Sequence, residues 1–77
     1  MKHKPRLYKL PEVLTQLLKD NKMTRKKLSQ MMGMSDTVAG KWANGESIPK
    51  LFEVMLIADI FNVSIEYLVY GAEGSDE

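Results

Sequence analysis

The charged side chains of this chain are unevenly distributed along it, and the basic ones gather in one part. All eleven Lys and Arg lie in residues 1–50 beside four acids, whereas residues 51–77 hold six acids and no base. The formal charge is therefore +7 in the first part and −6 in the second. Such asymmetry allows a nearly neutral protein to turn one face toward a polyanion, although both parts could equally be solvated surface.

The residue types that catalysis and metal binding require are scarce. His3 is the single histidine, cysteine is absent, and the sequence has no phosphate-binding loop and no carboxylate pair with a partner base. We therefore expect no enzymatic activity, no small-molecule substrate, no cofactor and no metal. The lack of cysteine suits a reducing compartment. No signal-peptide core and no run of about 18 apolar residues occurs, so we expect no membrane segment and a cytoplasmic location.

The segment Thr24–Gly45, TRKKLSQMMGMSDTVAGKWANG, predicts two short helices joined by a glycine turn. Thr24 can cap the first helix, and Gly33 can stop it in the left-handed conformation. Ser35 is a second N-cap candidate, for a helix that runs to Trp42 before Asn44-Gly45. Leu28, Met31 and Met32 would form the apolar face of the first helix. Two helices with such a turn present the second one to the major groove of DNA.

The remaining elements also read as helices. Pro11 suits the first turn of a helix that ends near Asn21, and Ser64 can cap a last helix over 65–69. Between them a helix begins near Lys50 and can close at Asn62 in the left-handed conformation. Its apolar residues recur at helical spacing: Leu51, Val54, Ile57, Ala58 and Phe61. The pattern predicts an all-α, compact five-helix bundle.

One small domain accounts for the chain. At 77 residues, only about 60% of the surface of the unfolded chain can be buried. We expect a flexible basic arm over residues 1–8, where four bases precede any periodic pattern. The helical domain follows over residues 9–71, and an acidic tail over 72–77.

Beyond the motif, the chain resembles the Cro/C1-type helix-turn-helix family of the lambdoid phage repressors and Cro proteins. The apolar positions of the family's first helix match Leu10, Leu14, Leu17 and Met23, and Ile48–Gly71 resembles its last two helices. The resemblance covers roughly sixty of the 77 residues. It implies a lambda repressor-like domain that binds double-stranded DNA.

The resemblance also implies which residues touch the DNA backbone. In this fold, amides at the start of the second helix point at a phosphate, and Thr24 and Arg25 occupy that place. The family commonly has Gln at the position of Arg25, whose guanidinium could grip a phosphate with two hydrogen bonds. Asn44 and Lys50 match phosphate-contacting positions beyond the third helix. These four residues would set the register of the protein on DNA.

Base reading falls, by the same match, to the exposed N-terminal face of the third helix: Asp36, Thr37, Val38, Gly40 and Lys41. Thr37 and Val38 could contact a thymine methyl, and Lys41 could reach guanine. Asp36 either accepts from cytosine N4 or is simply an acid that the helix dipole favours. Gly40 within the helix costs about 1 kcal/mol of stability relative to Ala. It is either simply tolerated or makes room for the duplex.

Two departures from the family concern the core. Leu18 and Ala43 stand where many members pair an Arg with a Glu. Replacing both partners of a buried pair with apolar residues is often neutral, so the fold should remain intact. Ala39 is smaller than the usual branched residue, and the adaptable side chains of the neighbouring methionines, with Trp42, could fill that volume. These methionines are Met31, Met32 and Met34.

Repressors of this kind generally pair by two-fold symmetry, so we expect a homodimer on a palindromic operator. The candidates for its interface are apolar residues in excess of one core face: Phe52, Leu56, Ile60, Val69 and Tyr70. The leading function is a phage or prophage Cro-like or minimal repressor that regulates transcription by covering a promoter. One alternative is a protein-interaction module of the same fold, an antirepressor or adaptor with little base reading. Another is an antitoxin that binds both DNA and a toxin.

Overall fold

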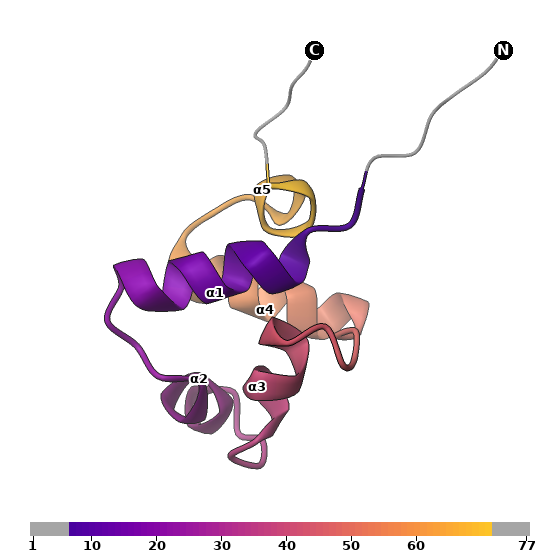
Figure 1. Cartoon of the computed structure of the whole chain (residues 1–77). Helices are drawn as coiled ribbons and strands as arrows, with labels where there is room; N and C mark the ends of the chain where they lie inside the picture. The colour runs from indigo at the N-terminus through magenta and orange to yellow at the C-terminus, as the bar shows by residue number, and fades with distance from the viewer. Residues whose placement is uncertain (1–6, 72–77) are drawn as a thin grey trace, which may run out of the picture.

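The computed structural model describes residues 7–71, which form five helices and no strand (Figure 1). The helices are α1 (Leu10–Asp20), α2 (Arg25–Met31), α3 (Val38–Ala43), α4 (Leu51–Phe61) and α5 (Ile65–Tyr70). The predicted all-α, five-helix architecture is therefore confirmed. His3, most of the expected basic arm, and the acidic tail lie outside the described residues.

Local side-chain chemistry starts two of these helices. The hydroxyl of Thr24 accepts from the amide of Lys27 at 3.0 Å, and that of Ser64 accepts from the amide of Tyr67 at 2.9 Å. Both predicted caps are confirmed, and each satisfies one amide that has no partner within its helix. Pro11 stands in the first turn of α1, as expected.

Four helices end in the same way. A residue with positive φ follows the helix, its amide donates to the carbonyl three residues back, and the next amide donates to the carbonyl five residues back. This double hydrogen bond is the Schellman motif. The residues with positive φ after α1 to α4 are Lys22, Gly33, Gly45 and Asn62. Gly33 and Asn62 adopt the predicted conformation, whereas Lys22 is a non-glycine residue that sequence reasoning did not single out.

The start of α3 differs from the prediction. The helix begins at Val38, three residues after the expected cap Ser35, and a turn closed by the amide of Val38 on the carbonyl of Ser35 at 3.1 Å precedes it. The reason lies in α2. The hydroxyl of Ser29 accepts from the amide of Ala39 at 2.9 Å, so the acceptor for the first turn comes from another helix. A local cap is not needed.

The core lies where α1 meets α3 and α5, and α2 and α4 close it from the sides. Leu10, Leu14, Leu28, Ile57 and Leu68 are fully buried within it. The remaining core residues are Val13, Leu17, Leu18, Ala39, Trp42, Ala43, Val54 and Ala58.

The buried positions of Leu18, Ala39 and Ala43 agree with the apolar replacement expected there. Met32 and Met34 pack against the core, together with the expected Met23.

Two expected core residues are exposed instead. Met31 is 49% exposed, because α2 turns Leu28, Ser29 and Met32 inward. Leu51 is 72% exposed at the first position of α4, while Pro49 before it is buried. Helical spacing alone does not say which of several adjacent apolar residues meets a neighbouring helix.

α1 runs through the middle of the molecule, with the α2–α3 pair at one end and α5 at the other (Figure 1). The amide of Lys9 donates to the carbonyl of Val69 at 2.7 Å and ties the start of α1 to α5. Gly71 permits this approach, because it has φ of +81° and a Cβ there would lie 3.4 Å from Val13. Within residues 7–71, no helix is long and apolar enough to cross a membrane.

Candidate nucleic-acid interface

The charge asymmetry of the sequence becomes an asymmetry in space. Helices α2 and α3 carry four exposed basic side chains, Arg25, Lys26, Lys27 and Lys41, and the exposed Lys50 lies directly before α4. By contrast, α4 and α5 contain no Lys or Arg. The helix pair is therefore the face of the described residues best suited to a polyanion.

A buried hydroxyl sets the geometry of that helix pair. Ser29 is the one buried polar residue among residues 7–71. Its Oγ donates to the carbonyl of Arg25 at 3.0 Å and accepts from the amide of Ala39 at 2.9 Å. One side chain thus bonds to the backbones of both α2 and α3, and it helps to fix the orientation of α3 relative to α2.

Two of the four predicted phosphate-contacting residues lie together. Nη1 of Arg25, at the start of α2, donates to Oδ1 of Asn44, at the end of α3, at 3.1 Å. The amide nitrogen of Asn44 donates in turn to Oε2 of Glu46 at 3.1 Å. Two successive hydrogen bonds thus join these three exposed side chains.

The other two predicted phosphate residues stand at helix starts. Thr24 directly precedes Arg25, and its hydroxyl is engaged as the cap of α2. Lys50 precedes α4, and its backbone amide donates to the carboxylate of Glu53 at 2.7 Å. This bond fixes the backbone of Lys50 and leaves its ammonium exposed.

The predicted base-reading residues fall in two structural settings. Asp36 and Thr37 lie exposed in the turn before α3, whereas Val38, Gly40 and Lys41 belong to the helix. Val38 is half-buried and packs against the core, so only part of its side chain remains for a thymine methyl. Thr37 and Lys41 are exposed and free of such packing.

Asp36 lies two residues before α3, just outside its first turn and still near the positive end of the helix dipole. The structure also gives it partners on α2. Its carboxylate accepts from Nε2 of Gln30 at 3.4 Å and lies 3.9 Å from Nζ of Lys26. Asp36 is thereby linked to the outer face of α2.

Gly40 lies beneath the side chain of Arg25. A Cβ built on Gly40 would be 3.6 Å from Cδ of Arg25, which is an ordinary van der Waals distance. Arg25 therefore crosses α3 over this glycine on its way to Asn44. Within the chain, an alanine would therefore fit at position 40, and both interpretations of Gly40 remain predictions.

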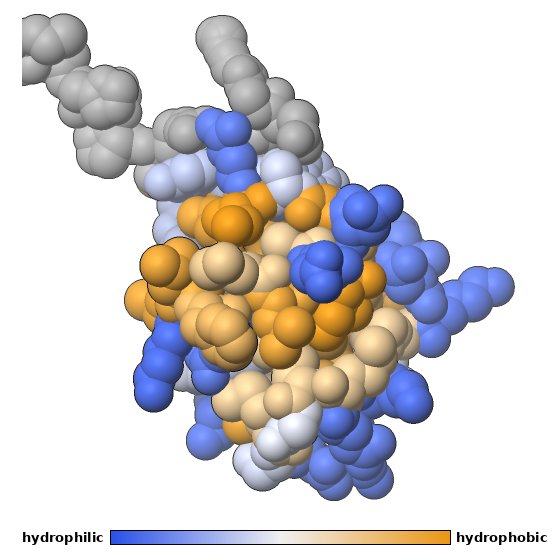
Figure 2. All heavy atoms as spheres, turned by 180° about the vertical axis from the view of Figure 1, so that it is seen from behind, coloured by the Kyte–Doolittle hydropathy of each residue, from blue (hydrophilic) through white to orange (hydrophobic). Residues whose placement is uncertain are grey.

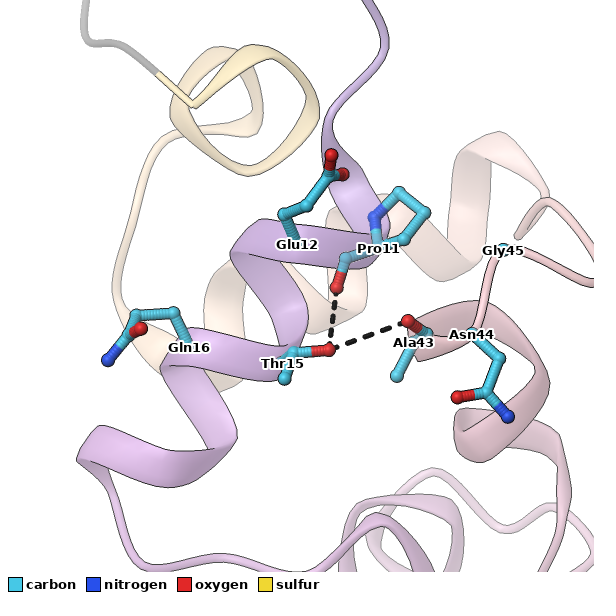
Figure 3. A pocket seen from close by; sticks show the side chains of 7 residues that line it. All are labelled: Pro11, Glu12, Thr15, Gln16, Ala43, Asn44 and Gly45. Carbon is cyan, nitrogen blue, oxygen red and sulfur yellow. Dashed lines mark hydrogen bonds between the residues drawn. The ribbon is translucent and has the colours of Figure 1, made fainter.

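A hollow of about 580 Å³ borders this surface between α1 and the end of α3 (Figure 3). The hydroxyl of Thr15 lines the hollow, and it lies 2.8 Å from the carbonyl oxygen of Pro11 and 3.4 Å from that of Ala43. Glu12, Gln16 and Asn44 supply its other polar groups. The carboxylate of Glu12 makes the hollow a poor site for an anion.

The apolar residues predicted for an interface lie on and beside α4. Phe52 is 73% exposed, whereas Leu56, Ile60, Val69 and Tyr70 are half-buried. Ile60 and Val69 pack against the core. A shallow hollow of about 320 Å³ is lined by Phe52, Met55, Leu56 and Asp59. Figure 2 shows the apolar side chains gathered on the face of the molecule that carries α4.

Sequence reasoning missed three residues of the helix pair, namely Ser29, Gln30 and Glu46. A serine directly after Leu28 on a short amphipathic helix was a signal for Ser29, because polar residues on a buried face need partners. For Glu46, the preceding Gly45 was a signal for the turn in which it lies. The side-chain bonds of Gln30 and Glu46 had no sequence signal, since they depend on the angle between α2 and α3.

Comparisons with known proteins agree with this geometry. Residues 14–68 match the family model described as helix-turn-helix. Over 62 residues the chain is 31% identical to the HTH-type transcriptional activator BcrR of Enterococcus faecalis, and the match covers 80% of this chain and 30% of the relative. This chain therefore spans less than a third of that protein.

A crystal structure of a transcriptional regulator from Listeria innocua has a similar fold. The TM-score is 0.78 at 20% identity, and the match covers 91% of this chain and 64% of that one. The α2–α3 geometry, the family match and this similarity of fold all indicate a helix-turn-helix domain. The chain belongs to the Cro/C1-type helix-turn-helix family of DNA-binding transcriptional regulators.

Proposed function

We propose that this protein binds a specific DNA sequence through α3 and regulates transcription there. One observation carries the proposal: Arg25 at the start of α2 donates to Asn44 at the end of α3 at 3.1 Å, on a helix pair whose two backbones are both bonded to Ser29. Arg25, Asn44, Thr24 and Lys50 would contact phosphates and set the register. Thr37 and Lys41, which project from exposed positions, would then meet the base edges.

The proposal includes a homodimer on a palindromic operator. One small domain makes few base contacts, so pairing doubles the recognised sequence. The exposed apolar hollow at Phe52 and Leu56 is the surface that we propose for pairing, with Ile60, Val69 and Tyr70 beside it. By this proposal the dimer covers a promoter, as a Cro-like or minimal phage repressor does. The Enterococcus relative is named an activator, so the sign of regulation needs its own measurement.

Selection of bound sequences from a random duplex library, at two salt concentrations, tests DNA binding. We expect a palindrome whose half-site centres lie about 10 base pairs apart. We also expect weaker binding at higher salt, because phosphate contacts release counterions. A transcription assay on the selected operator then distinguishes repression from activation. Binding without sequence preference would contradict the proposal.

Two variants separate the roles of the residues. Arg25→Ala should weaken binding to all sequences alike and reduce the salt slope by about 1. Lys41→Ala should instead relax the preference at one base position, at a cost of about 1 to 3 kcal/mol. If both variants weakened binding to every sequence equally, Lys41 of α3 would not contribute to base recognition.

A second candidate function is a protein-interaction module of the same fold, either an antirepressor or adaptor, or an antitoxin with a toxin partner. Two carboxylates on the basic face favour it: Glu46 engages the side chain of Asn44, a proposed phosphate contact, and Asp36 places a negative charge 3.9 Å from Nζ of Lys26. Affinity for duplex DNA that is weak and independent of salt would support this alternative. A pull-down on the exposed α4 face would then be the next experiment.

A further inference from the structure

The basic face of the helix pair contains two acidic side chains that are bonded to its donors. Glu46 accepts from the side-chain Nδ2 of Asn44, and Asp36 accepts from Gln30 beside Lys26. Both carboxylates are exposed, so burial does not require either pairing. A carboxylate and a phosphate present similar anionic oxygens to such donors.

The backbone holds Glu46 in this position. Gly45 has φ of +78° and its amide donates to the carbonyl of Trp42 at 3.2 Å, while the amide of Glu46 donates to the carbonyl of Lys41 at 2.8 Å. This Schellman motif directs the chain back over the end of α3. The carboxylate of Glu46 consequently lies against the side chain of Asn44 at 3.1 Å.

Asp36 lies close to donors at the other end of α3, through longer contacts. The turn before the helix, closed by the amide of Val38 on the carbonyl of Ser35, carries Asp36 toward α2. Its two oxygens there are shared between Gln30 and Lys26, at 3.4 Å and 3.9 Å. The two carboxylates thus occupy donors before and after α3.

We propose that Asp36 and Glu46 are internal competitors of DNA phosphates and restrain binding to DNA of any sequence. The inference rests on the proposed function of this face. When a phosphate takes the place of either carboxylate, a hydrogen bond is exchanged for another and the displaced negative charge stays nearby. Sequence-independent binding comes almost wholly from phosphate neutralisation, so this term is the one that the carboxylates reduce.

The proposal differs from base reading by Asp36 in a measurable way. If Asp36 accepted from cytosine, its replacement would change the preferred base at one position. A competitor of phosphate changes the affinity for every duplex and leaves the preferred sequence as it was.

The test uses the whole chain and a labelled duplex of random sequence, titrated by fluorescence anisotropy over a series of salt concentrations. The variants are Glu46→Gln, Asp36→Asn and the double variant. Both replacements keep an amide oxygen that can accept the same hydrogen bonds, so only the charge is lost. Asp20→Asn is the matched control, since its carboxylate accepts from Gln16 on α1 at 2.8 Å.

We expect each single variant to bind random duplex roughly two- to five-fold more tightly, which is the factor that one exposed charge interaction is worth. The slope of log affinity against log salt should steepen by up to about 0.9 for each additional phosphate that the protein neutralises. The Asp20→Asn control should bind like the wild type. Sequence selection with Asp36→Asn should return the wild-type operator.

Several results would overturn the inference. Equal tightening by the control would mean that net charge alone acts, and unchanged or weaker binding by the variants would mean that the carboxylates only orient their partners. In either case, salt-dependent binding by the wild type would leave the proposed function standing. If neither the wild type nor any variant bound DNA, both would fail. Binding by the double variant alone would support the competition and contradict DNA binding as the function of the wild type.

Discussion

Ser29 shows how much of this helix pair depends on a single side chain. Its hydroxyl is fully buried and bonds to the backbone of both α2 and α3. No other described polar residue is buried, so nothing nearby is placed to replace it. The presentation of α3, and with it the proposed recognition of DNA, rests on this contact.

Ser29→Ala should lower the free energy of unfolding by about 1 to 3 kcal/mol, because the amide of Ala39 would be left buried without its acceptor. Urea unfolding followed by circular dichroism measures the change. Ser47→Ala, at an exposed position, is the control and should stay within about 0.5 kcal/mol of the wild type. Equal stability of the two variants would show that the Ser29 bonds contribute nothing net.

Gly40 allows a test of the packing of Arg25. Gly40→Ala should raise the free energy of unfolding by about 1 kcal/mol, because Ala favours the helix and its Cβ fits at 3.6 Å from Arg25. Its affinity for the selected operator should match the wild type. Thermal unfolding and a DNA titration measure the two effects. A stable Gly40→Ala protein with much weaker binding would show instead that the duplex needs the space.

Helix ends are the elements that organise the loops of this fold. The same double hydrogen bond closes four helices, and after α3 it also carries Glu46 back to Asn44. Glycine or asparagine takes the left-handed position in three cases, and these residues signalled it in advance. Lys22 is the fourth and carries a side chain at φ of 53°. Such a conformation costs about 1 to 2 kcal/mol in a residue with a Cβ.

Lys22→Gly should therefore raise the free energy of unfolding, by about 0.5 to 1 kcal/mol after the larger entropy of the unfolded glycine is subtracted. The midpoint of urea unfolding measures it. Lys19→Gly removes the same charge within α1 and should lower the free energy of unfolding by about 1 kcal/mol, because glycine disfavours a helix interior. Destabilisation by both variants would contradict the strain at position 22.

In the molecule as a whole, the basic side chains of α2 and α3 and the apolar surface residues of α4 belong to different helices. This separation suits the proposed homodimer, because a chain can pair through α4 while α3 meets DNA. Phe52, 73% exposed and at the edge of the hollow, is the side chain on which pairing should depend most.

Phe52→Lys should shift the protein from dimer to monomer and weaken operator binding, because an ammonium in the apolar interface loses its water without a partner. Sedimentation at tens of micromolar, with and without operator, measures the state. Leu7→Lys is the control, since Leu7 is 74% exposed but lies before α1. A wild-type monomer under both conditions would remove the proposed interface.

The helices and most of their caps could be predicted from the amino-acid sequence alone. Thr24, Ser64, Gly33 and Asn62 act within a few residues of their own position, and local chemistry does not depend on the remaining chain. The resemblance of Thr24–Gly45 and its surroundings to the Cro/C1-type family was also readable, because its signals are spacings of apolar and turn residues. The family match over residues 14–68 confirms it.

The packing of the helices, by contrast, determines the orientation of α2 and α3 and the side-chain contacts between them. The start of α3 at Val38, the burial of Ser29 and the exposure of Met31 all follow from the angle at which α2 packs on α3. The links from Arg25 through Asn44 to Glu46, and from Lys26 to Asp36, join residues whose separation in sequence carries no helical period. Long polar side chains find such partners only after packing has brought two elements together, so no local pattern records them.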